Sequence, residues 1–142
     1  MTHGATRWTD LREFARRYTA AWCSQNARSV AGFFAPDGTL TINGATPSVG
    51  RRAIAEAAQS FMTAFPDLKV EMDDVLEQGD RVIYKWTFEG THTGPGGSGK
   101  RVRISGFEEW HRDDDGLISE SVGSFDAAEY ERQIREDMCP GR

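Results

Sequence analysis

Alternation of apolar and polar residues predicts three consecutive β-strands in the second half of the chain. These strands span residues 81–89, 101–111 and 116–125. In the first of them one parity holds Val82, Tyr84, Trp86 and Phe88. A period of two is typical of a sheet with one buried face. The glycine-rich link 94–99 and the turn 113–116 are both short, so we expect the three strands to be adjacent and antiparallel.

Apolar residues recur at helical spacing in the first half. The pattern predicts an amphipathic helix from Thr9 to about Cys23, with Leu11, Phe14 and Tyr18 on its apolar stripe. Further expected elements are a short helix at about 27–34, strands at 39–43 and 68–77, a strong helix at 50–65 and a short helix at 127–134. We place Thr9 or Asp10 as the N-cap of the first helix.

Helices followed by strands indicate an α+β fold rather than alternating βαβ units. We expect a curved antiparallel sheet that wraps on the N-terminal helices and forms a cone, with a cavity at its wide end. Gly106, in the middle of a strand, is a candidate site for a β-bulge that bends the sheet. One domain over residues 8–136 is expected, with flexible tails at 1–7 and 137–142.

The composition argues against several classes of protein. The chain has 142 residues, a formal charge of −5 and a pI near 5.2, so it offers no basic surface for nucleic acid or for an anionic membrane. It lacks a signal-peptide pattern and an 18-residue apolar run, and we expect a cytoplasmic protein. Cys23 and Cys139 are expected to be reduced. Neither a metal-binding nor a phosphate-binding motif is evident, and we expect no cofactor.

Asp126 follows the third strand and is the principal candidate for chemistry. A carboxylate at such a junction is either a helix N-cap or, if it opens onto an apolar cavity, an acid/base with a raised pKa. The candidate lining of that cavity is Trp22, Trp86, Phe107 and Trp110. Candidate hydrogen-bond donors are Tyr18, Asn43, His92 and His111, each with a structural role as the alternative.

Glu108 and Glu109 are adjacent in the second strand, so one of them points to each face of the sheet. One is therefore a candidate buried acid inside the cone. The alternative is that the inward carboxylate pairs with Lys85, Arg101 or Arg103. The same uncertainty of register applies to Trp110 and His111.

Several strings, in this order, resemble the SnoaL-like polyketide cyclase branch of the nuclear transport factor 2-like (cystatin-like) superfamily. They are Tyr18–Trp22 with Asp37–Gly38, Trp86–Gly94, Gly99–Val102 with Gly106, and Asp115–Glu120 followed by Asp126 and Gln133. The resemblance covers about residues 8–135 and implies a conical fold with an apolar pocket, usually a homodimer through the exposed sheet face. This fold hosts enzymes and pure binding domains alike.

In the cyclases the residue matching Asp126 moves a proton next to a carbonyl, and a histidine on the preceding strand assists. The nearest match to that histidine is His111, although Arg112 fits as well. The family's usual tryptophan before the aspartate is replaced by Val122, which argues against a fused-ring polyketide substrate. Arg101 and Arg103 stand where the superfamily's epoxide hydrolases carry an Arg-x-Asp pair, which argues against epoxide opening.

The resemblance and the residues together favour a cofactor-independent cyclase or isomerase that acts on a small apolar metabolite. Asp126 would abstract a proton alpha to a carbonyl, while a histidine or tyrosine stabilises the enolate. The alternative is a module of the same fold that binds a small molecule or dimerises without catalysis.

Overall fold

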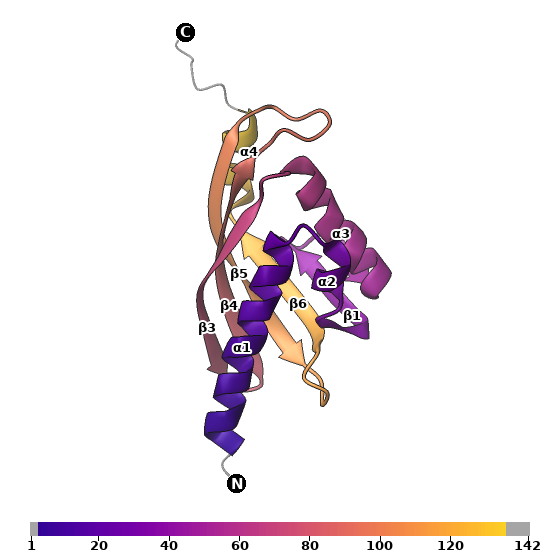
Figure 1. Cartoon of the computed structure of the whole chain (residues 1–142), viewed down its shortest axis with the longest axis vertical. Helices are drawn as coiled ribbons and strands as arrows, with labels where there is room; N and C mark the ends of the chain where they lie inside the picture. Colours follow the sequence, from indigo (N-terminus) through magenta and orange to yellow (C-terminus); the bar gives the residue numbers. More distant parts are fainter. Residues whose placement is uncertain (1–2, 136–142) are drawn as a thin grey trace.

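The computed structural model describes residues 3–135, with side chains from residue 11 onward. Its four helices are α1 (His3–Cys23), α2 (Ala27–Ala31), α3 (Arg51–Ala64) and α4 (Ala127–Arg135). Its six strands are β1 (Phe34–Ile42), β2 (Ser48–Val49), β3 (Lys69–Gln78), β4 (Arg81–Thr91), β5 (Arg101–Arg112) and β6 (Ile118–Phe125). This arrangement confirms the α+β class (Figure 1).

One mixed sheet holds all six strands, in the order β2-β1-β6-β5-β4-β3. The predicted run of three adjacent antiparallel strands is confirmed in β4, β5 and β6, and β3 pairs antiparallel with β4 as well. The prediction of a wholly antiparallel sheet is wrong for one pair of strands, because β1 runs parallel to β6. A parallel pair needs a long crossover, and here α3 and four strands lie between its two members.

Several element boundaries differ from the prediction. Helix α1 begins at His3, so Thr9 and Asp10 lie inside it and are not its N-cap, and residues 3–7 are helical rather than a tail. The rest of the predicted tails, residues 1–2 and 137–142, lies outside the described residues. Helix α2 ends at Ala31, and β1 starts at Phe34 and continues through Pro36 with a shift of register before Thr39.

Two departures from regular strands shape the sheet. A bulge between Met72 and Asp74 of β3 reverses the parity, so that Val75 is fully buried on the same side as Val70. The predicted bulge at Gly106 is wrong, because β5 keeps its register with β4 on both sides of that residue, and Gly106 itself pairs with Phe125 at the end of β6. Gly106 is instead a place of close approach: a Cβ there would meet the Ser124 carbonyl oxygen at 2.4 Å and Trp86 Cζ2 at 2.6 Å.

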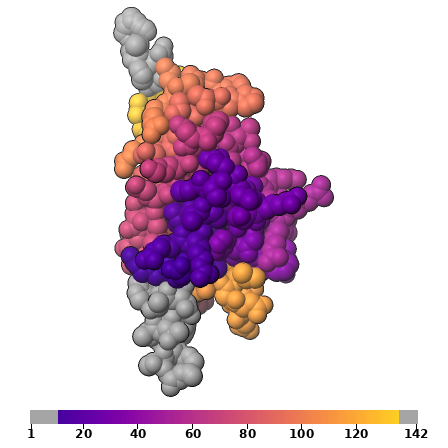
Figure 2. Space-filling view, in the orientation of Figure 1, coloured from indigo at the N-terminus to yellow at the C-terminus, as the bar shows by residue number. Residues whose placement is uncertain are grey.

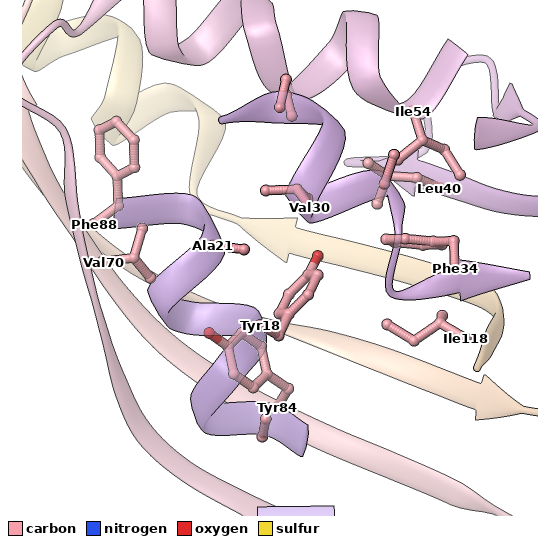
Figure 3. Packing of buried hydrophobic residues seen from close by; sticks show 14 of the residues in the cluster. Tyr18, Ala21, Val30, Phe34, Leu40, Ile54, Val70, Tyr84, Phe88 and Ile118 are labelled. Atoms are coloured by element: carbon pink, nitrogen blue, oxygen red, sulfur yellow. The ribbon is translucent and has the colours of Figure 1, made fainter. Parts of the chain in front are cut away.

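Helices cover one face of the sheet. Figure 2 shows α1 spread over the middle of this face, with α3 beside it. Tyr18 and Ala21 of α1 are buried between Tyr84 of β4 and Val30 of α2 (Figure 3). The rings of Tyr18 and Tyr84 are 5.4 Å apart between centroids. Burial of this large aromatic and aliphatic cluster is the main force that holds α1 to the sheet.

Helix α4 closes the end of the sheet that β6 leaves unpaired. Strand β6 ends opposite Gly106, so the backbone of Arg103 in β5 has no strand partner on that side. The side-chain amide of Gln133 takes the place of one. The Arg103 N–H donates to Gln133 Oε1 at 2.7 Å, and Gln133 Nε2 donates to the Arg103 carbonyl at 3.0 Å. This pairing holds α4, and with it Tyr130, against the sheet.

Candidate functional site

A cavity of about 80 Å³ lies between the helices and the concave face of the sheet. Seven aromatic rings dominate its lining: Trp22, Phe61, Tyr84, Trp86, Phe88, Phe125 and Tyr130. The remaining lining residues are Leu40, Ile42, Val70, Ile104, Glu108, Gly123 and Ser124. Glu108 is the one ionisable carboxyl group in this list, so an acid stands in an otherwise apolar wall.

Three side chains from α1, β5 and β6 position the Glu108 carboxylate. Its Oε1 accepts hydrogen bonds from Trp110 Nε1 at 2.8 Å, from Ser121 Oγ at 2.8 Å and from the Tyr18 hydroxyl at 3.0 Å. Its Oε2 is reached by the Tyr18 hydroxyl alone among these donors, at 3.2 Å. Oε1 is therefore saturated, and Oε2 is the oxygen that can exchange a proton with a bound molecule.

Burial sets the acidity of this group. Glu108 is 8% exposed, and loss of hydration raises its carboxyl pKa above the ordinary value, while the hydrogen bonds from Trp110, Ser121 and Tyr18 oppose that rise. Desolvation, and then the nearby Glu108 carboxylate, raise the pKa of the Tyr18 phenol, which stays a hydrogen-bond donor. A carboxyl group with a raised pKa, placed in an apolar cavity, is suited to accept and return a proton.

A second polar group in the lining belongs to Trp86. Its indole Nε1–H is buried, and it is the one buried side-chain donor or acceptor without a hydrogen-bond partner among the residues described. The ring packs edge-on against Phe125, with centroids 6.0 Å apart, and its Cζ2 edge lies over Gly106. A larger residue at position 106 would displace this ring.

Four of the residues singled out from the sequence take part in this site. Trp22 and Trp86 line the cavity. Tyr18 and Trp110 are fully buried and donate to Glu108. The structure therefore brings these side chains together, but around a different acid from the one on which the prediction centred.

Asp126 lies outside the cavity lining. It is exposed, and its Oδ1 accepts a hydrogen bond from the Glu129 N–H at 3.0 Å, as expected for a residue that caps α4. His111 lies on the sheet face opposite to Trp110, with its Nε2 3.9 Å from Glu120 Oε1. The expectation that Asp126 opens onto the cavity does not agree with these positions, and its catalytic role stays a prediction.

The other three candidates also lie outside the lining. Asn43 adopts a left-handed conformation with φ of 52°, and its Oδ1 accepts from the Phe125 N–H at 2.9 Å, so it holds a turn. His92 accepts from the Ser98 N–H at 3.0 Å through Nδ1 and stabilises the loop between β4 and β5. Phe107 is 40% exposed on the outer face of the sheet, where the dimer contact is predicted.

The parity of β5 resolves the choice between the two adjacent glutamates. Trp110 and Glu108 face the helices, whereas Glu109 faces outward and pairs with Arg81. The predicted neutralisation of the inward carboxylate by Lys85, Arg101 or Arg103 is wrong, since neutral donors surround Glu108. Residues 108 and 110 are two apart in one strand, so the inward position of the large Trp110 side chain predicts that Glu108 also points inward.

Within the part of the chain that the structure describes, no group of His, Cys, Asp and Glu side chains is arranged to hold a metal ion. None of the helices within residues 3–135 is long and apolar enough to cross a membrane.

The architecture, a curved and unclosed sheet covered by N-terminal helices, is shared by solved proteins of the nuclear transport factor 2-like and ketosteroid isomerase-like folds. A putative SnoaL-like polyketide cyclase from Jannaschia sp. CCS1 has a TM-score of 0.79 and 20% identity, over 91% of this chain and 94% of its own. A protein with a ketosteroid isomerase-like fold from Catenulispora acidiphila DSM 44928, in complex with trimethylamine, has a TM-score of 0.76 and 17% identity, over 86% of this chain and 92% of its own.

AclR, a putative hydroxylase from Streptomyces galilaeus, has a TM-score of 0.75 and 22% identity, over 89% of this chain and 81% of its own. At these identities the similarity shows the fold alone. The model of the SnoaL-like polyketide cyclase family matches residues 12–134, and the chain belongs to that family. A comparison with curated proteins gave no significant match.

Proposed function

We propose that this protein is a cofactor-independent enzyme of the cyclase or isomerase type, and that Glu108 is its acid/base. The observation that carries the proposal is a single carboxylate, buried in an aromatic cavity, with three donors on one oxygen and only the shared Tyr18 hydroxyl on the other. Membership of the SnoaL-like family supports the reaction class.

In the proposed reaction, Glu108 Oε2 takes a proton from the carbon next to a carbonyl of the substrate. The electron pair of that C–H bond moves to the carbonyl and forms an enolate. If the enolate is conjugated with a C=C bond, Glu108 returns the proton to another carbon, which gives an isomer. Alternatively, the enolate carbon attacks a second carbonyl of the same molecule, which closes a ring and leaves an alkoxide that takes the proton back from Glu108. The three donors on Oε1 hold the carboxylate in one orientation throughout, so little reorganisation accompanies proton transfer.

The dimensions of the cavity favour a small substrate. Its volume of about 80 Å³ is well below that of pockets for drug-sized ligands, roughly 300–1,000 Å³. The apolar lining favours a compound with few polar groups. A single-ring or short unsaturated ketone fits these limits better than a fused-ring polyketide does.

Deuterium exchange tests the proposal without knowledge of the natural substrate. Small cyclic ketones, with cyclohexenone as the first, are incubated with the protein in deuterated water, and loss of the α-proton signal is followed by NMR. We expect the protein to accelerate exchange over buffer, and Glu108→Gln to reduce the acceleration at least about 100-fold, because it lacks the proton acceptor. Binding of the ketones without acceleration would contradict catalysis and favour a ligand-binding module.

A further inference from the structure

The buried Trp86 N–H has no hydrogen-bond partner in the described structure, so a ligand with an acceptor atom would satisfy it. A buried donor without a partner costs roughly 1–3 kcal/mol relative to a paired one. The indole N–H of Trp110, by contrast, donates a hydrogen bond to Glu108 at 2.8 Å. Because Trp86 is one of the residues that line the cavity, a molecule bound there can supply the acceptor.

We infer that Trp86 donates a hydrogen bond to an acceptor oxygen of the ligand, and that the ligand is a flat, neutral carbonyl compound. This inference deepens the proposed function, on which it rests for the identity of the site. Among the residues that line this wall, Glu108 is the one with a carboxyl group, and Trp86 is the one with a buried donor that has no partner. One accepts a proton, and the other offers an N–H to the oxygen on which negative charge forms.

The position of Trp86 is built into the sheet. Trp86 pairs with Gly106 across β4 and β5, and the absence of a side chain at Gly106 leaves room for the Cζ2 edge of the indole. The ring of Phe125 packs edge-on against the indole. The indole N–H is thus held in place before a ligand arrives, which is the condition under which a donor contributes most to binding of a developing charge.

The same donor argues against a cationic ligand. Aromatic cages bind alkylammonium ions through the faces of their rings, and a nearby carboxylate assists. Here Tyr18, Trp110 and Ser121 already direct their donors at Glu108, and the Trp86 N–H adds another positive dipole to the wall. An acceptor on the ligand satisfies that dipole, whereas a cation leaves it unpaired.

NMR of the indole N–H groups tests this inference. The chain has four tryptophans, so the ¹⁵N-labelled protein gives four indole signals, and sequential assignment identifies that of Trp86 without a variant. Three probes share a six-membered ring: cyclohexenone, cyclohexene and cyclohexylammonium. We expect cyclohexenone alone to move the Trp86 N–H signal downfield, as a new hydrogen bond does.

The variant Trp86→Phe keeps a ring and removes the donor. It should weaken cyclohexenone binding about three- to tenfold, the range of one hydrogen bond, and leave cyclohexene binding unchanged. Equal shifts from cyclohexenone and cyclohexene, no shift from either, or tighter binding of cyclohexylammonium would overturn the inference. The Glu108→Gln protein should give the same Trp86 shift, so a failure of catalysis and a failure of this inference are distinguishable.

Discussion

Tyr18 and Glu108 lie 90 residues apart in the sequence, and the Tyr18 hydroxyl donates to both carboxylate oxygens of Glu108, at 3.0 Å and 3.2 Å. This contact joins the first helix to the fifth strand through the centre of the core. It links the packing of α1 to the acidity of the one carboxylate in the cavity, and the two properties should change together.

Replacement of Tyr18 by phenylalanine should reveal that link. The variant removes one donor from a buried carboxylate, and we expect the free energy of unfolding to fall by about 1–3 kcal/mol. The pKa of Glu108 should rise further, because one of the hydrogen bonds that oppose desolvation is lost. Denaturant unfolding at several pH values measures both effects.

Tyr84→Phe is the matched control for this experiment. Its hydroxyl bonds Thr19 and not Glu108, so the variant loses a buried hydroxyl of the same kind. It should change stability without changing the pH dependence. Identical pH dependence in the two variants would contradict a specific coupling between Tyr18 and Glu108.

The raised pKa of Glu108 also predicts how stability depends on pH. The folded chain binds this proton more tightly than the unfolded chain, whose pKa lies near the reference value of 4.5. The stabilisation is therefore fully present below that value and is lost as pH rises through the folded pKa. In Glu108→Gln the amide stays neutral at every pH, so this contribution disappears.

Thermal unfolding of the two proteins from acidic to neutral pH measures the difference. The melting temperature of the wild type should fall relative to that of Glu108→Gln as pH rises. A constant difference between the two melting curves across that range would mean that Glu108 titrates as an ordinary carboxyl group.

Gly106 is expected to be intolerant of a side chain. In Gly106→Ala the Cβ would lie 2.4 Å from the Ser124 carbonyl oxygen and 2.6 Å from Trp86 Cζ2, so the backbone or the indole must move. We expect a loss of about 1–3 kcal/mol in the free energy of unfolding, the usual cost of overpacking. Gly32→Ala is the control, because its Cβ would meet no heavy atom closer than 3.4 Å. Equal stability of the two variants would show that β5 adapts.

The Gln133 side chain should protect the backbone of β5. In Gln133→Ala the Arg103 N–H loses its acceptor, and we expect its amide to exchange at least about tenfold faster, the effect of losing roughly 1.4 kcal/mol of protection. Hydrogen exchange followed by NMR measures this rate. Gln59→Ala, which removes an exposed glutamine bonded to Thr63, should leave it unchanged.

The sequence predicted most of the fold because its elements have strong periods. The alternation at Val82, Tyr84 and Phe88 and the helical stripe through Ile54 and Met62 are both buried as expected. Element boundaries and irregular strand pairings were harder to predict from the sequence. The bulge near Asp73 and the parallel pairing of β1 with β6 depend on how distant segments meet, and a local pattern does not contain that information.

The sequence predicted two of the residues that line the cavity, but it did not single out Glu108 as the principal acid. Trp22 and Trp86 are large apolar residues on buried faces, so their place in the cavity follows from parity. Asp126 ends a strand and begins a helix, and the local rule for such a residue, helix capping, describes its observed hydrogen bond. Glu108 was a candidate, but its donors come from α1 and β6, whose approach depends on the tertiary fold.

A direct comparison of Glu108→Gln with Asp126→Asn in the deuterium-exchange assay tests the assignment of the acid/base. Both variants replace a carboxylate by an isosteric amide, one in the cavity and one at the surface. We predict that Glu108→Gln loses at least about 100-fold of the exchange rate, while Asp126→Asn keeps its rate within about twofold and loses only part of the stability that the α4 cap supplies. Loss of exchange in Asp126→Asn, with the wild-type rate retained in Glu108→Gln, would contradict the assignment.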